Sequence, residues 1–181
     1  MDVPSRNAAD AGRVMTCLGG EIIVRAATLH DLEAVLEMRL ALLREHPTHP
    51  IYGRLRPDVD KRARDLFVTQ LRAMNETIYL ALIGDDVAGI LRCVESIGSL
   101  LLDPARYAYV SSAYVKPSFR RRGVLRALLL AVERWSRLRG LEQMRLHNVA
   151  GSMEAEGAWS ALGFDVVEQV RVKNVTSRKD G

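Results

Sequence analysis

The sequence predicts an α/β protein of the α+β type, with one domain in which a sheet is flanked by helices. The length of 181 residues, 48% of them hydrophobic and 27% charged, is ordinary for one globular domain. β-Branched runs and segments of helical periodicity follow the order strand, helix, helix, strand, strand, strand, helix, strand, helix, strand. The Gly84-Asp85-Asp86 turn between two of these runs is typical of a β-hairpin.

The N-terminal part is expected to lead into a strand and two helices. Thr28 and Asp31 have the spacing of a helix-capping box, and Pro47 and Pro50 require a loop after the first helix. Leucines and one phenylalanine at helical spacing predict the buried face of each helix. The expected order is a flexible leader over 1–20, a strand over 21–25, a helix over 29–45, a loop, and a helix opened by Pro57 and Asp58 with Ala63, Leu66, Phe67, Leu71 and Met74 on one face.

The C-terminal part is expected to alternate strands with two helices. Gly140 and Gly163 follow helical periodicity and predict helix ends in the left-handed conformation. The expected elements are strands over 77–83 and 87–95, a strand that ends at Val115, a helix with Leu125, Leu128, Leu129, Val132, Trp135 and Leu138 inward, a strand over 144–149, a helix over 153–162, a strand over 166–174 and a disordered tail over 176–181.

The segment from Tyr114 to Leu129 predicts an anion site. It is a strand, a turn rich in arginine and the start of an amphipathic helix, so backbone N–H groups and the helix dipole converge on one spot. Gly123 lets the backbone approach an anion closely, and the neighbouring arginines stay charged near neutral pH. A phosphate or pyrophosphate suits such a site. A solvated charged face or a nucleic-acid patch is the alternative for an arginine run.

Several classes of protein lose support. The sequence has no Walker motif, no glycine triad after a strand and no nucleic-acid-binding motif. Cys17 and Cys93 are too few for a disulfide framework and lack metal-ligand spacing, so no metal site is expected. A net charge of +4 and a pI near 9.3 are explained by ordinary solubility and do not require a nucleic-acid partner. No apolar run is long enough to span a membrane, so we expect a cytoplasmic protein without membrane or nucleic-acid partners.

The turn Arg120-Arg121-Arg122-Gly123-Val124-Leu125 resembles the Arg/Gln-x-x-Gly-x-Gly/Ala signature of the GNAT superfamily of acetyl-CoA-dependent N-acetyltransferases. It matches at the first and fourth positions, while Leu125 stands where a small residue is usual. With its neighbours, the resemblance covers about Ile22 to Asn174. It implies a mixed, mostly antiparallel sheet, a single N-acetyltransferase domain over 21–175, and transfer of the acetyl group of acetyl-CoA to a primary amine, in a monomer or a homodimer.

The resemblance also implies site residues. In the family, the strand before the turn and the strand after the following helix splay apart. The pantetheine arm then pairs with the opened backbone as an added strand does. The implied coenzyme-binding residues are Tyr114, Val115, Arg120, Arg121, Arg122, Gly123, Val124, Leu125, Arg126 and Ser152. Tyr109 stands where histone-acetyltransferase-like members carry a glutamate that acts as the general base. A phenol is a poor base at neutral pH, so Tyr109 would hold a water molecule or orient the amine; the alternative is that it only packs against a helix. Trp159 stands where many members carry a tyrosine that acts as the general acid toward the thiolate, and an indole is no useful proton source. Packing is expected for Trp159, with a coenzyme contact as the second choice.

The acceptor is expected to be a small-molecule amine. The loop after the first helix carries rings and guanidiniums that suit a carboxylate or phosphate, and a solvated loop is the alternative. The residues concerned are His46, His49, Tyr52, Arg54 and Arg56. Near the end of the strand over 144–149, Asn148 is either a strand-end cap or an acceptor contact, and His147 is expected to be a surface or cleft residue rather than a metal ligand. A protein N-terminal or lysine acetyltransferase and a catalytically silent acyl-CoA-binding module stay open as alternatives.

Overall fold

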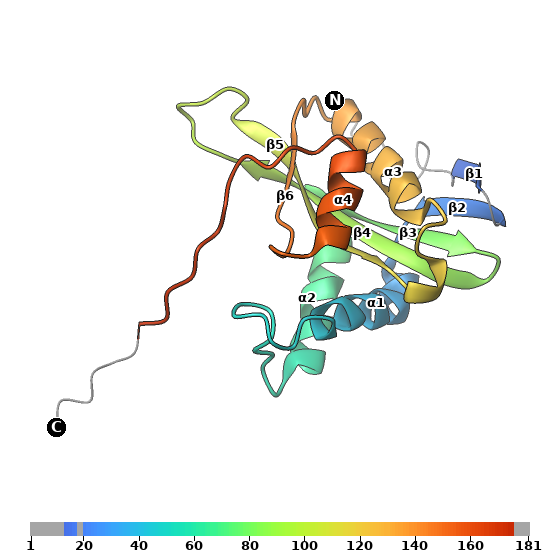
Figure 1. The fold of residues 1–181 in the computed structure, drawn as a ribbon. Helices are drawn as coiled ribbons and strands as arrows, with labels where there is room; N and C mark the ends of the chain where they lie inside the picture. Colours follow the sequence, from blue (N-terminus) through green and yellow to red (C-terminus); the bar gives the residue numbers. More distant parts are fainter. Residues whose placement is uncertain (1–12, 18–19, 176–181) are drawn as a thin grey trace.

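The computed structural model describes residues 13–17 and 20–175, which fold around one mixed sheet (Figure 1). The strands are β1 Arg13–Cys17, β2 Gly20–Ala26, β3 Glu76–Ile83, β4 Asp86–Ile97, β5 Arg106–Val115 and β6 Met144–Leu146. The helices are α1 Leu32–Arg44, α2 Val59–Arg72, α3 Val124–Leu138 and α4 Met153–Ala161, with 3-10 turns at Leu29–Asp31 and Pro117–Phe119.

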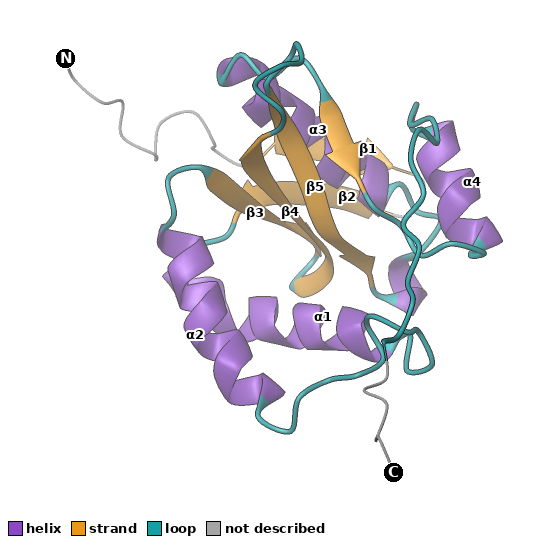
Figure 2. Cartoon of the chain, turned by 90° about the vertical axis from the view of Figure 1, so that its left-hand side faces the viewer, coloured by secondary structure: helices purple, strands orange, loops and turns teal. Residues whose placement is uncertain are grey.

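The six strands lie in the sheet in the order β1-β2-β3-β4-β5-β6. Neighbours from β1 to β5 are antiparallel, and β6 runs parallel to β5. Helices α1 and α2 cover one face of the sheet and α3 covers the other (Figure 2). This architecture confirms the mixed, mostly antiparallel sheet flanked by helices that the sequence predicts.

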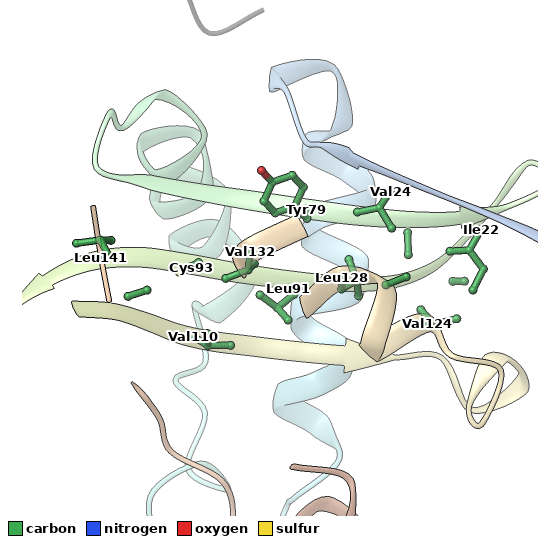
Figure 3. Close-up of a cluster of buried hydrophobic side chains, with 14 residues drawn as sticks. Ile22, Val24, Tyr79, Leu91, Cys93, Val110, Val124, Leu128, Val132 and Leu141 are labelled. Carbon is green, nitrogen blue, oxygen red and sulfur yellow. The ribbon is translucent and has the colours of Figure 1, made fainter. Parts of the chain in front are cut away.

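Two apolar layers hold the helices to the sheet. On one face, Val124, Leu128 and Val132 of α3 pack against Leu91 and Val110 of the central strands (Figure 3). Each such side chain contributes about 1.5–3 kcal/mol when it is fully buried. On the other face, the layer comprises Val35, Leu36 and Met38 of α1, Ala63, Phe67 and Leu71 of α2, and Ile78, Leu80, Ile90 and Tyr114 of the sheet. The arginine-rich turn is therefore anchored by the buried start of α3.

Three residues predicted to be inward lie outside the core. Leu66, Met74 and Leu138 are 49%, 63% and 68% exposed. Near the end of α3 the inward position belongs to Ser136, whose hydroxyl donates a 2.9 Å hydrogen bond to the Val132 carbonyl. A buried serine satisfied by its own helix carries no hydrophobic signal, so the apolar pattern misplaced the last turn of this face.

The expectation of a leader without secondary structure through residue 20 is wrong for Arg13–Cys17. These residues form β1, which pairs with β2 from Arg13↔Val24 to Cys17↔Gly20. A segment of five residues becomes a strand when a sheet edge is beside it, and the edge of β2 is not visible in the local sequence. Residues 1–12 of the expected leader and the expected tail over 176–181 lie outside the described residues.

The final strand expected over 166–174 is also wrong. Residues 164–175 have no regular secondary structure, and the chain runs away from the sheet after α4 (Figure 1). Val166, Val167 and Val170 are 75%, 85% and 65% exposed. Alternating β-branched residues favour extended backbone, but a strand also needs a partner edge, and this segment has none in the part of the chain that the structure describes.

Candidate functional site

A cleft opens where β5 and β6 separate. The two strands pair only from Ala108↔Met144 to Val110↔Leu146, where β6 ends, while β5 continues to Val115. Opposite Leu91, β5 carries two residues, Ser112 and Ala113, because the register shifts between Ile90 and Arg92. Ser112 has a positive φ of 59°. Such a β-bulge bends its strand, and here it lies within the part of β5 that has no β6 partner.

This cleft has a volume of about 1160 Å³ and gathers residues that are far apart in the sequence. The end of α1, the bulged part of β5, the turn before α3, the segment after β6 and the inner side of α4 all line it. Of the predicted coenzyme-binding residues, Tyr114, Val115, Arg120, Arg121, Gly123, Val124, Leu125, Arg126 and Ser152 line the cleft, whereas Arg122 does not. The structure thus brings nine of these ten residues to one cavity.

The turn before α3 presents free backbone N–H groups to the cleft. Phe119 N donates to the Lys116 carbonyl at 2.9 Å, Arg121 and Gly123 have positive φ of 60° and 84°, and α3 begins at Val124. The first backbone hydrogen bond of the helix runs from Ala127 N to the Gly123 carbonyl at 2.9 Å. The N–H groups of residues 124–126 therefore lack a helical acceptor and suit an anion.

The arginines of the turn have different surroundings. Arg120 pairs with Glu45 at the end of α1 and donates from Nε to the Val115 carbonyl at 3.1 Å, so it ties the turn to α1 and β5. Arg122 lies over the Phe119 ring, 5.6 Å from its centroid. Arg121 and Arg126 are exposed at the cleft and form no ion pair with any residue in the described ranges. These two side chains are free to meet phosphate charge.

Tyr109 and His147 form a pair at the point where the strands part. The Tyr109 hydroxyl lies 2.8 Å from His147 Nδ1, and the rings meet edge to face with centroids 5.5 Å apart. The parallel register, Tyr109↔Arg145, brings the residue after β6 beside this phenol. Burial raises the pKa of Tyr109, so the phenol stays neutral at neutral pH. A hydrogen-bonded phenol and imidazole can orient an amine and accept its proton.

The sequence left His147 as a surface or a cleft residue; the structure places it in the cleft, paired with Tyr109, a contact that was not predicted. The contact between Tyr109 and His147 could have been predicted only by pairing the expected strand over 144–149 in parallel with the strand that ends at Val115. Asn148 also lines the cleft, and its side-chain nitrogen contacts the Val149 carbonyl at 3.4 Å.

Helix α4 closes one side of the cleft. Its N-cap is Ser152, whose hydroxyl accepts a 3.4 Å hydrogen bond from Ala155 N. Trp159 lines the cleft, packs against the α3 side of the core and meets the Phe164 ring at a centroid distance of 5.4 Å. The packing expected for Trp159 is thus present, and the indole also borders the cavity.

The opposite wall differs from the expected acceptor loop. His46 and Tyr52 line the cleft, but His49, Arg54 and Arg56 do not. His49 Nδ1 accepts from the backbone N–H groups of Ile51 and Tyr52 at 3.2 Å each and stabilises the loop. The wall is instead made by residues that sequence reasoning missed: Arg39 of α1, Arg92 of β4 and Ser111 of β5. A cation within the apolar stripe of α1 was the signal for Arg39.

Comparisons with known proteins agree with this architecture. The sequence model of the acetyltransferase (GNAT) family matches residues 37–164. The aminoglycoside N(6')-acetyltransferases type 1 of Salmonella typhimurium and Salmonella enteritidis are each 32% identical over 68 residues, which are 38% of this chain and 47% of the relative. The chain therefore spans about half the length of the curated relatives it matches.

Solved structures share the fold. The aminoglycoside N-acetyltransferase AAC(6')-Iy in complex with CoA has a TM-score of 0.71 at 22% identity, over 89% of this chain and 99% of that one. A predicted acetyltransferase from Clostridium acetobutylicum with acetyl-CoA has a TM-score of 0.69 at 16% identity, over 84% of this chain and 96% of that one.

Among the described residues of our chain, no helix is long and apolar enough to cross a membrane, and no group of three potential metal ligands occurs.

Proposed function

Because the chain belongs to the acetyltransferase (GNAT) family, we propose that it transfers the acetyl group of acetyl-CoA to the primary amine of a small molecule. The observation that carries the proposal is the parting of β5 from β6 beside the arginine-rich turn. That parting leaves a strand edge, a helix N-terminus and a phenol–imidazole pair around one cavity. The cytoplasmic location stays a prediction, and so does the homodimer, one of the two assembly states that the resemblance implies.

The coenzyme would lie along the unpaired edge of β5. Backbone groups between Ser111 and Val115 have no β6 partner, so the amides of the pantetheine arm could pair with them as an added strand does. The pyrophosphate would meet the N–H groups at the start of α3, with Arg121 and Arg126 as counter-charges. Arg120 would hold the turn in place through Glu45, and Arg122 would contribute only long-range charge.

Acyl transfer from a thioester needs a neutral amine and ends with a protonated thiol. Tyr109 would orient the amine and His147 would receive its proton, a division of roles supported by the 2.8 Å contact between the Tyr109 hydroxyl and His147 Nδ1. Trp159 has no proton to give at neutral pH, so water would protonate the departing thiolate. A thioester is already activated, and positioning supplies most of the remaining acceleration.

The size of the cleft supports a small acceptor. A volume of about 1160 Å³ is slightly above the roughly 300–1,000 Å³ of small-molecule pockets, and the pantetheine arm would take part of it. Aminoglycoside acetyltransferases among the relatives act on small-molecule amines by name, which agrees with this choice.

Titration calorimetry with acetyl-CoA and a thiol-release assay across amines, amino acids, polyamines and peptides test the proposal. We expect micromolar coenzyme binding and release of thiol with small amines. Turnover of peptides alone would indicate a protein-modifying enzyme. Coenzyme binding without turnover of any amine would indicate a silent module, and no coenzyme binding at high micromolar concentration would reject the proposal.

A further inference from the structure

The α1 wall of the cleft contains a guanidinium without an anionic partner. Arg39 is half-buried and lines the cavity, and its guanidinium carbon lies 5.4 Å from the centroid of the Phe67 ring. Its Nε is fully buried and has no hydrogen-bond acceptor, and none of the ion pairs within the described part of the chain includes Arg39. A buried donor left without an acceptor costs about 1–3 kcal/mol, so this arrangement needs a reason.

The nearby carboxylates are committed to other cations. On α1, Glu33 pairs with Arg64 at 2.7 Å and Glu37 with Lys116 at 2.9 Å. The same helix ends at Glu45, which pairs with Arg120. Each acidic residue next to Arg39 along the helix is therefore turned toward a different positive charge.

The sheet side of the wall adds a second guanidinium. Arg92 pairs with Glu76 and donates from Nη1 to the Ser111 hydroxyl at 3.1 Å. Glu76 thus compensates Arg92 and leaves one net positive charge at Arg39. Burial, together with repulsion by Arg92, lowers the pKa of Arg39 to about 10. The side chain still stays charged at neutral pH, and an anion beside it would relieve both penalties.

We propose that Arg39 binds an oxyanion, a carboxylate or a phosphate, of an acceptor that carries this group near its primary amine. The inference rests on the proposed function, because it names the class of acceptor for that same cleft. An arginine fork matches both oxyanions by paired hydrogen bonds. Tyr52, Tyr109 and Ser111 border the same cavity and offer hydroxyls to the rest of the acceptor.

The same charge opposes polycationic acceptors. An ammonium group placed beside Arg39 would meet the guanidiniums of Arg39 and Arg92, and Glu76, which pairs with Arg92, does not line the cleft. Of the carboxylates that do line it, Glu45 pairs with Arg120 and Glu154 belongs to α4. We therefore expect a substrate preference opposite to that of an aminoglycoside-modifying enzyme, in spite of the shared fold.

Matched acceptor pairs test the proposal in the full chain. The pairs are phenylalanine against phenylalaninamide and phosphoethanolamine against ethanolamine, with kanamycin as a polycation. We expect kcat/KM to favour the oxyanion member of at least one pair, and which pair shows the preference tells carboxylate from phosphate. Arg39→Gln should lose about 10- to 100-fold on that member and little on its neutral partner, with the KM for acetyl-CoA unchanged.

The matched control is Arg44→Gln, which removes an arginine of the same helix that is exposed, pairs with Asp60 at 3.2 Å and lies outside the cleft. It should leave the preference intact. Arg39→Lys keeps the charge without the fork and should retain part of the preference, which covers the case that Arg39→Gln does not fold. Equal kcat/KM within both pairs for the wild type, or an equal loss on both members in the Arg39 variants, would overturn the inference.

A binding measurement separates this inference from the proposed function. Calorimetry of the CoA complex uses N-acetylphenylalanine and N-acetylphosphoethanolamine against N-acetylphenylalaninamide and N-acetylethanolamine. Preferential binding of an anionic ligand that is lost in the Arg39 variants supports the anion site even if no amine is turned over. Absence of that preference overturns the site even if neutral amines are acetylated.

Discussion

Gly89 of β4 offers a sharp test of how the sheet positions the arginine-rich turn before α3. A Cβ at this position would lie 2.8 Å from Val124 Cγ1, 3.1 Å from the Tyr114 carbonyl oxygen and 3.2 Å from Leu128 Cδ1. Ordinary carbon–carbon contacts are about 3.5–4.0 Å. Gly89→Ala therefore pushes the first turn of α3 away from the sheet, and this turn presents the N–H groups that we assign to the pyrophosphate.

The magnitude follows from two opposing effects. Alanine in a strand recovers about 0.5–1 kcal/mol relative to glycine, because the unfolded chain is less free. Overpacking of a filled core costs about 1–3 kcal/mol. The second effect is larger, so we expect the free energy of unfolding to fall by about 1–2 kcal/mol. The dissociation constant for CoA should rise about tenfold, the equivalent of one weakened charge-assisted hydrogen bond.

Urea unfolding and titration calorimetry measure the two quantities. Gly140→Ala is the matched control: φ is +66° and no atom lies within 4 Å of the added Cβ, so it strains the backbone at the far end of α3. It should lose about 1 kcal/mol of stability without a change in CoA affinity. If Gly89→Ala binds CoA as tightly as the wild type while losing stability, the packing of α3 against the sheet does not determine the position of the arginine-rich turn, and the reasoning fails.

Three further predictions concern the turn, the chemistry and pH. Gly123→Val should weaken CoA binding by at least about tenfold and lower the melting temperature, because φ is +84° and a side chain would crowd the anion; unchanged calorimetry would contradict this. Tyr109→Phe and Trp159→Phe should each lower kcat by no more than about tenfold, below the ~10²–10⁴-fold effect of an acid–base group; a collapse of kcat at unchanged melting temperature and CoA affinity would show that the replaced group is essential. The Arg25 side chain, by its hydrogen bond, lowers the pKa of Asp31 from 3.8 to about 2, so its stabilisation is present above pH 4 and is lost as the pH falls toward 2. In urea unfolding, the free energy of unfolding of the wild type should exceed that of Asp31→Asn by about 1 kcal/mol at pH 7, after allowance for solvent screening, and most of this difference should be lost at pH 2, where Asp31 is about half protonated.

Features set by neighbours in the chain could be read from the sequence. The Thr28–Asp31 capping box forms as expected, with Thr28 N donating to Asp31 Oδ2 at 2.8 Å. Gly140 and Gly163, both predicted to end helices, take positive φ. Such features depend on contacts within a few residues, so local composition is enough to predict them.

Contacts between distant segments could not be predicted in this way. The Tyr109–His147 pair joins residues 38 positions apart, and the ion pair of Arg120 with Glu45 joins residues 75 apart. Both depend on strand register and on helix placement across the sheet. The same limit explains the missed strand β1 and the absent final strand, because a strand exists only where another edge pairs with it.

The sequence by itself determined the order of most elements and the arginine-rich turn between β5 and α3, because these follow from periodicity and from the conformations that glycine and proline allow. Only the tertiary structure decided which arginines are free. Arg120 is held by Glu45, whereas Arg39 faces the cleft and pairs with no carboxylate among residues 13–17 and 20–175. A charge acquires its role from the counter-charges that folding places around it, and in this chain those counter-charges come from remote parts of the sequence.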